Sequence, residues 1–119
     1  MILLTNKEEA AALTLHMSVM RADFRNLLKR QYKAKKGEYL KAYDYVKSEC
    51  EKQLDNDLEY KEQHLNVIDL EVLTAFLNAY VPKLKETLED ANAEDEKDGQ
   101  VFILTCIQQR CKELLKDVA

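Results

Sequence analysis

The chain has 119 residues, of which 46% are apolar and 34% are charged, and its formal net charge is −4. This length and composition are typical of one globular domain with a modest core, and they exclude a disordered chain. The acidic balance argues against a general nucleic-acid-binding protein, because such proteins are normally basic.

Helix is the expected structure throughout, because two glycines and one proline leave little turn chemistry for a β fold. The first helix is predicted over residues 6–31. Asn6 and Glu9 have the spacing of a helix N-cap and the acid that reaches back to it. Apolar residues then recur at steps of three and four, as on one face of a helix: Ala10, Leu13, Met17, Met20, Phe24 and Leu27.

The second helix is predicted to begin near Gly37 and to run to about residue 64. The same apolar spacing continues through Tyr39, Tyr43, Val46, Cys50 and Leu54. Leu58 and Leu65 lie one and three turns further on, so they extend the same face.

The third helix is predicted over residues 67–90, and the fourth from about Gln100 to residue 118. Asn66 and Asp69 repeat the N-cap pattern of the first helix. Pro82 lies inside the third helix, where its missing backbone N–H predicts a kink.

The two halves of the chain, about 6–64 and 66–118, resemble each other. A shift of 60 residues places Asn6 on Asn66 and Leu13 on Leu73. Identities are few, so a duplicated helical hairpin remains a hypothesis. Two such hairpins would bury their apolar faces against each other in an all-α, four-helix bundle. They would pack within one chain or swap between two chains, and the sequence leaves both open.

Two loops of the predicted bundle carry opposite charges. KRQYKAKKG, residues 29–37, has five positive charges, whereas EDANAEDEKDG, residues 89–99, has six negative charges and one positive charge. An up-down-up-down bundle would place both loops at the same end, so we expect them to be neighbours. Each exposed ion pair between them would contribute up to about 1 kcal/mol.

Nothing in the chain has the spacing of a metal site or a catalytic site. The candidate soft ligands are Cys50, Cys106, Cys111, His16 and His64, and they lack the close pairs that zinc sites use. Calcium-loop, Glu-x-x-His, phosphate-binding and nucleophile-elbow patterns are also missing. We therefore expect no metal, no cofactor and no enzymatic activity. An all-helical enzyme that holds Mg²⁺ is the weakest alternative, because the helical register brings no carboxylates together.

The expected location is the cytoplasm. No segment approaches the roughly 18 apolar residues of a membrane span. The opening MILL is too short for the core of a signal peptide and has no basic flank. Three cysteines, an odd number within helical patterns, do not suggest a disulfide framework.

The leading hypothesis is a small non-enzymatic interaction protein, a regulator or inhibitor that binds a partner protein or itself through a helical face. Apolar residues exceed what one core face needs, and tyrosine is common at interfaces. The candidate protein-binding residues are Tyr39, Tyr43, Tyr45, Tyr80 and Val81. The last two lie where the kink at Pro82 would open a groove.

The alternative hypothesis is a nucleic-acid-binding module. Its candidate basic patch comprises Arg21, Arg25, Lys29, Arg30, Lys33, Lys35 and Lys36. Tyr32 lies among these charges, so a phosphate backbone and one stacked base could be accommodated. The acidic second half of the chain argues against this interpretation.

Overall fold

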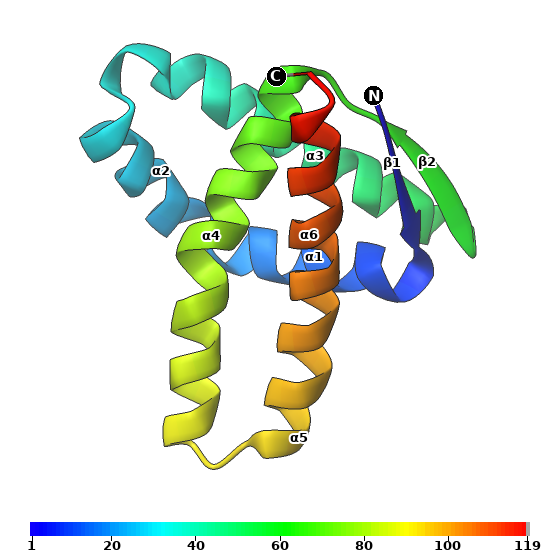
Figure 1. Cartoon of the computed structure of the whole chain (residues 1–119), viewed down its shortest axis with the longest axis vertical. Helices are drawn as coiled ribbons and strands as arrows, with labels where there is room; N and C mark the ends of the chain where they lie inside the picture. Colours follow the sequence, from blue (N-terminus) through cyan, green and yellow to red (C-terminus); the bar gives the residue numbers. More distant parts are fainter. Residues whose placement is uncertain (119) are drawn as a thin grey trace.

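The computed structural model describes residues 1–118, including every side chain except that of Glu96, and it is mostly helical with one small sheet (Figure 1). The elements in chain order are β1 (Ile2–Asn6), α1 (Lys7–Val19), α2 (Arg21–Gln31), a 3₁₀ turn (Lys33–Lys35), α3 (Lys36–Asp55), β2 (Tyr60–His64), α4 (Val67–Asp90), α5 (Glu94–Glu96), a π-helical turn (Lys97–Val101) and α6 (Phe102–Lys116). None of the helices within residues 1–118 combines the length and the apolar character needed to cross a bilayer.

The helical content supports the predicted all-α class, but a four-helix bundle is not confirmed. In Figure 1, α1 runs across α4 and α6 rather than along them. The predicted second helix is split into α3 and β2, and the predicted first helix is split into α1 and α2. The third and fourth helices agree with α4 and α6.

A long-range hydrogen bond accompanies the break in the first helix. The Tyr43 hydroxyl, from α3, donates to the backbone carbonyl of Met17 in the last turn of α1. α1 ends at Val19 beside this contact, and the chain changes direction at Met20. The apolar periodicity of the sequence does not reveal the break, because α2 also buries its apolar residues Phe24 and Leu28 in the core. The prediction of one helix over residues 6–31 was therefore wrong.

The second predicted helix ends early because the chain turns back to make a sheet. Asp57 adopts a left-handed conformation, with φ of 52°, just beyond the end of α3. β2 then pairs antiparallel with β1, in a register that runs from Ile2 opposite His64 to Asn6 opposite Tyr60. The segment YKEQH contains one apolar residue, so it had no strand signal of its own.

Both predicted helix starts are confirmed. The Asn6 side chain accepts the N–H of Glu9 at 2.8 Å, and the Asn66 side chain accepts that of Asp69 at 2.8 Å. In each case the acid also accepts the N–H of its asparagine, which completes a capping box. Each box closely follows a strand, so both halves have a strand, a capped helix and a helix packed against it. This layout is consistent with the hypothesis of a duplicated unit.

An aromatic cluster joins the two halves of the core. The ring of Tyr43 stacks on Phe24 with centroids 4.9 Å apart, and it meets Phe76 edge-on at 5.5 Å. Phe24 and Phe76 are themselves 5.7 Å apart. The three rings come from α3, α2 and α4, and each pair contributes about 0.5–1.5 kcal/mol beyond its buried area.

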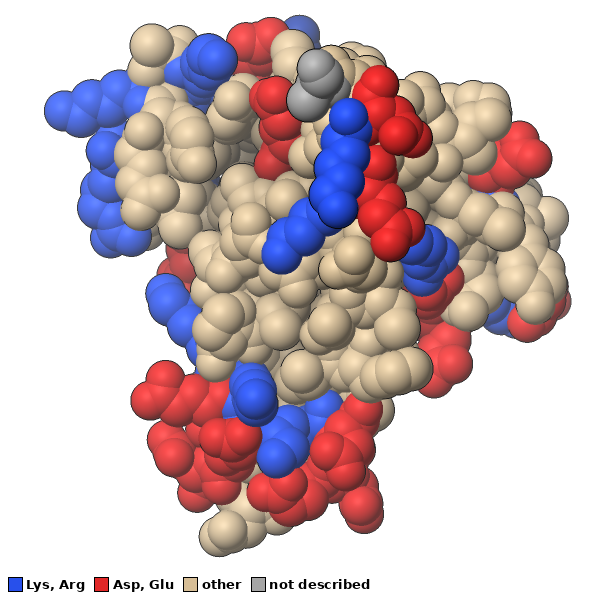
Figure 2. All heavy atoms as spheres, in the orientation of Figure 1, with Lys and Arg blue, Asp and Glu red and all other residues tan. Residues whose placement is uncertain are grey.

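The oppositely charged loops are not neighbours, so that prediction was wrong. Figure 2 shows lysine and arginine gathered at the upper left, where Figure 1 places the end of α2 and the start of α3. Aspartate and glutamate gather at the bottom, around the turn between α4 and α5. The break at Met20 directs α2 away from the axis of α1 and carries the basic loop to another side of the molecule.

The capping boxes generate a stability prediction. Asn6→Ala and Asn66→Ala should each lower the free energy of unfolding by about 1 kcal/mol, because each leaves a helix N–H without its partner. Urea denaturation measures the change. Asn26→Ala, at an exposed position within α2, is the matched control and should change stability by less than about 0.6 kcal/mol. Equal losses in all three variants would contradict the capping role.

Candidate interaction surfaces

Three of the five predicted protein-binding residues belong to the core. Tyr39, Tyr43 and Val81 are 7%, 0% and 8% exposed, so they are not available as surface anchors. Burial raises the pKa of Tyr43, and its hydroxyl is already used by Met17. The sequence did not separate these residues from surface residues, because the same helical spacing describes a core face and a binding face. Tyr45, in contrast, is 41% exposed.

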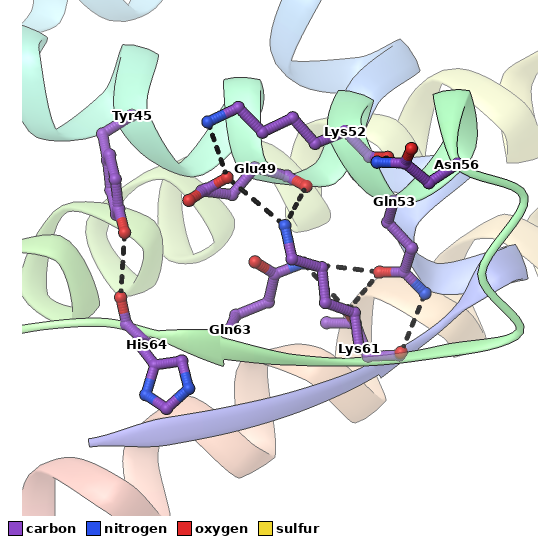
Figure 3. Close-up of polar contacts among 9 residues, drawn as sticks. Tyr45, Glu49, Lys52, Gln53, Asn56, Lys61, Gln63 and His64 are labelled. Carbon is purple, nitrogen blue, oxygen red and sulfur yellow. Dashed lines mark hydrogen bonds and ion pairs between the residues drawn. The ribbon is translucent and has the colours of Figure 1, made fainter.

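Tyr45 lies beside β2 rather than on an open helix face (Figure 3). Its hydroxyl donates to the backbone carbonyl of His64 at 3.2 Å. Nearby, Lys61 of β2 donates to the backbone carbonyl of Glu49 at 3.1 Å and to its carboxylate at 3.3 Å. Burial tends to raise the pKa of Glu49, but hydrogen bonds from Lys61 and Lys52 outweigh it and lower the pKa. The side chains of α3 thus cover the outer edge of β2.

A buried polar network holds the inner face of the sheet against α3 (Figure 3). The Thr5 hydroxyl donates to the side-chain carbonyl of Gln53 at 2.7 Å, and the Gln53 amide donates to the Thr5 and Leu58 carbonyls at 3.0 and 3.2 Å. The Gln63 amide donates to the Thr5 hydroxyl and to Gln53, both at 3.3 Å. Because these groups are buried, breaking the network would leave several of them unpaired. The network therefore joins both strands of the sheet to α3.

The outer face of the sheet exposes three large apolar side chains. Ile2, Leu4 and Tyr60 are 48%, 49% and 65% exposed. The register places Leu4 opposite Glu62 and Asn6 opposite Tyr60, so Leu4 and Tyr60 are diagonal neighbours on one face. We call these three residues the sheet face. Further exposed apolar side chains lie close to it in sequence: Met1, Leu58 and Val67.

The free edge of β1 is also occupied. Arg110 of α6 donates to the backbone carbonyl of Leu4 and pairs with the carboxylate of Glu9. Both strand edges thus carry side-chain contacts, which discourages pairing with a further strand. The open surface of the sheet is its face. Sequence reasoning missed it because residues 1–5 were not assigned to a strand and residues 60–64 were assigned to a helix.

A groove lies between α2 and α4 at Tyr80, in the region where the kink at Pro82 was predicted to open one. Its volume is about 220 Å³. It is lined by Met20, Phe24, Leu27, Phe76, Ala79 and Tyr80, together with the polar Asp23, Asn26, Arg30 and Lys83. Val81 is on the buried side of the helix. Of the two predicted groove residues, only Tyr80 lines it.

The Tyr80 hydroxyl is held from beneath the groove by His16. Its oxygen lies 2.8 Å from Nδ1 of His16, and Nε2 of His16 lies 2.8 Å from the side-chain oxygen of Gln100. An amide oxygen only accepts, so Nε2 carries the proton and Nδ1 accepts from Tyr80. Burial raises the pKa of Tyr80, which makes it a poor nucleophile. His16 and Gln100 therefore orient the side chain of Tyr80 and do not activate it as a nucleophile.

Most of the predicted basic patch is open to solvent. Arg21 is half-buried and already paired, because its guanidinium makes two hydrogen bonds of 2.8 Å to Asp44 and lowers the pKa of that carboxyl group. Arg25, Lys29, Arg30, Lys33 and Lys35 are exposed, and Lys36 is half-buried. Within residues 1–118, none of these six takes part in an ion pair.

The remaining candidate ligands do not assemble into a site in the described part of the chain. No three histidine, cysteine, aspartate or glutamate side chains there come close enough to hold a metal ion. Cys50 and Cys111 are buried, and burial raises the pKa of each thiol to about 12. His16 is occupied by Tyr80 and Gln100.

Comparisons with known protein families, with curated proteins and with solved structures each gave no match. Exposure, charge and side-chain contacts are the properties that distinguish one surface of this chain from another. The sheet face and the basic patch are the two surfaces that these observations distinguish.

The cysteines generate a prediction about reactivity. At pH 8, a thiol with a pKa of about 12 is ionised in only about one molecule in 10⁴, so Cys50 and Cys111 should resist Ellman's reagent in the native protein. The half-buried Cys106 should react first. Mass spectrometry of labelled peptides identifies the order, and unfolding in urea should expose all three. Rapid native labelling of Cys50 or Cys111 would contradict the packing.

Proposed function

We propose that this is a non-enzymatic, cytoplasmic interaction protein that binds a partner protein through the sheet face, and that it regulates or inhibits the partner by occupying its surface. The observation that carries the proposal is the exposure of Ile2, Leu4 and Tyr60 on one face of an ordered sheet. Three cysteines outside any disulfide support the cytoplasmic location.

The energetics favour such a contact. Fully burying a large apolar side chain stabilises a complex by about 1.5–3 kcal/mol, and each sheet-face residue is about half exposed or more. The network of Thr5, Gln53 and Gln63 already holds the strands in place, so little conformational freedom is lost on binding. Tyrosine adds area with a polar tip, as is common at the centre of interfaces.

The chemistry of the face indicates a partner surface with an apolar centre. Glu62 and His64, the exposed cross-strand partners of Leu4 and Ile2, supply polar groups between the apolar ones. Tyr45 contributes a partly exposed ring beside His64. This is the one residue of the predicted tyrosine group that remains part of the proposed contact, while Tyr80 belongs to the separate groove.

The proposal is tested by photo-crosslinking at Tyr60 in extract from the source cell. A benzophenone amino acid at position 60 should give one discrete adduct, whereas the same group at the exposed Leu15 of α1 should not. Excess unlabelled wild-type protein should compete for the adduct. A variant with Leu4→Thr and Tyr60→Thr, which keeps good strand formers at both positions, should fail to compete while retaining its melting temperature.

Two results would count against the sheet face. Identical adducts at positions 60 and 15 would show non-specific contact. Competition by the double-threonine variant at the wild-type concentration would show that the partner binds elsewhere. Tyr45→Phe gives a further check, because it removes only the hydrogen bond to His64 and should leave most of the affinity intact.

The basic patch supports a second candidate function, nucleic-acid binding. In Figure 2 the acidic loop lies far from the basic patch. The acidic loop therefore does not neutralise the positive charge of the patch, and this observation favours the second candidate. The patch ends a projecting helix, α2, and includes exposed Arg25, Lys29 and Arg30. Cations in this arrangement release counterions from a phosphate backbone on binding.

This second candidate predicts a steep dependence on salt. The affinity for a labelled 20-base-pair DNA should fall with a slope of about −3 to −5 in log K against log salt if four or five phosphates are contacted. Lys33→Glu, Lys35→Glu and Lys36→Glu together should weaken binding at least about tenfold. Lys112→Glu with Lys116→Glu, on α6, is the control and should have little effect. Unchanged binding by the first variant would exclude the patch.

A further inference from the structure

Two arms of opposite charge diverge from the groove between α2 and α4 (Figure 1). The basic arm is α2 with the turn that follows it, residues 21–36. The acidic arm is the second half of α4 with the turn that follows it, residues 83–98. Figure 1 shows the basic arm leaving toward the upper left and the acidic arm toward the bottom. The sheet lies on the right of the same view, so this surface is separate from the sheet face.

The tips of the arms have nearly complementary charge. Residues 29–36 contain five lysines and arginines and no acid, whereas residues 89–98 contain six acids and one lysine. The lysine of the acidic arm, Lys97, is already paired with Glu89 and Glu94. Asp90, Asp95 and Asp98 are exposed and take part in none of the ion pairs found within residues 1–118.

The groove between the arms supplies a partly apolar centre. Met20, Leu27 and Tyr80 line it and are only half-buried. Arg30 of the basic arm and Lys83 at the start of the acidic arm also line the groove, and Asp23 is the one acidic residue among the lining residues, so the groove is cationic overall. An occupant should therefore be acidic along the arm and partly apolar where it reaches the groove.

We propose that the occupant is a second copy of this chain, in a twofold dimer where the acidic arm of each copy lies along the basic arm of the other. In a twofold dimer, both arms of both copies are paired at once. In a head-to-tail assembly of many copies, the copy at each end has one arm without a partner. The acidic arm also carries Leu84 and Leu88, half-buried on α4, which would meet the groove of the partner copy.

The size of the molecule allows this interface. A standard interface covers about 800 Å² of each partner, and the chain exposes 6893 Å² in all. Exposed ion pairs are individually weak and are screened by salt. The dimer is therefore a salt-sensitive assembly that depends on opposite charges for its geometry.

Charge exchange between the arms tests the proposal. The basic-arm variant carries Lys33→Glu, Lys35→Glu and Lys36→Glu, and the acidic-arm variant carries Asp90→Lys, Asp95→Lys and Asp98→Lys. An acid at position 36 in the first turn of α3 and a lysine at position 90 in the last turn of α4 suit the helix dipoles, so both variants should fold. Circular dichroism and melting temperature check this. Mass in solution is measured by light scattering during size-exclusion chromatography.

The wild type should be dimeric in about 20 mM salt and monomeric in about 500 mM salt. Each variant alone should be monomeric in low salt, because the tips of its two arms, residues 29–36 and 89–98, then carry net charges of the same sign. An equimolar mixture should form a heterodimer, because each tip then meets a tip of opposite net charge. The variant with Leu4→Thr and Tyr60→Thr should dimerise like the wild type, which separates this inference from the proposed function.

Three results would overturn the dimer. The wild type could remain monomeric in low salt at about 100 µM, a concentration that populates even a weak complex. The two variants could remain dimeric alone. The mixture could fail to form the heterodimer although both variants are folded. If the wild type is monomeric and the basic-arm variant still loses DNA affinity, the basic arm serves nucleic acid instead.

Discussion

The fold depends on one buried tyrosine. The Tyr43 hydroxyl donates a hydrogen bond to the backbone carbonyl of Met17, and its ring packs against the rings of Phe24 and Phe76. The hydroxyl contact accompanies the end of α1, and the ring contact sets where α2 lies against α3 and α4. The direction of α2 then determines that the basic loop projects from the body and that a groove opens beside Tyr80. One side chain thus links core packing to the charge distribution on the surface.

Structural features that depend on neighbouring residues could be predicted from the sequence, and features that depend on distant residues could not. The capping boxes at Asn6 and Asn66 involve residues three apart, so their spacing alone predicts them. The helix break at Met20 involves Tyr43, and the strands are separated by more than 50 residues. Apolar periodicity cannot report either feature, because it continues through the break and is missing from β2. The helical class was therefore predictable, whereas the topology was not.

The candidate sites show the same division. The basic patch was predictable because exposed lysines and arginines need no long-range information, although the loss of Arg21 to Asp44 was not visible. The tyrosine group was only partly predictable, since Tyr39 and Tyr43 follow the core spacing and Tyr45 does not. The sheet face could not be predicted at all, because its three residues meet only once β1 and β2 have paired.

The pairing of distant strands also has a consequence for the order of folding. β1 is synthesised well before β2, and joining them directly would close a loop of more than 50 residues at a cost in chain entropy. Packing of α1 against α3 shortens that loop to the few residues after Asp55, where Lys7 meets Asp57 and the carbonyl of Glu59. On a ribosome, β1 would thus remain unpaired until α1 and α3 have packed together.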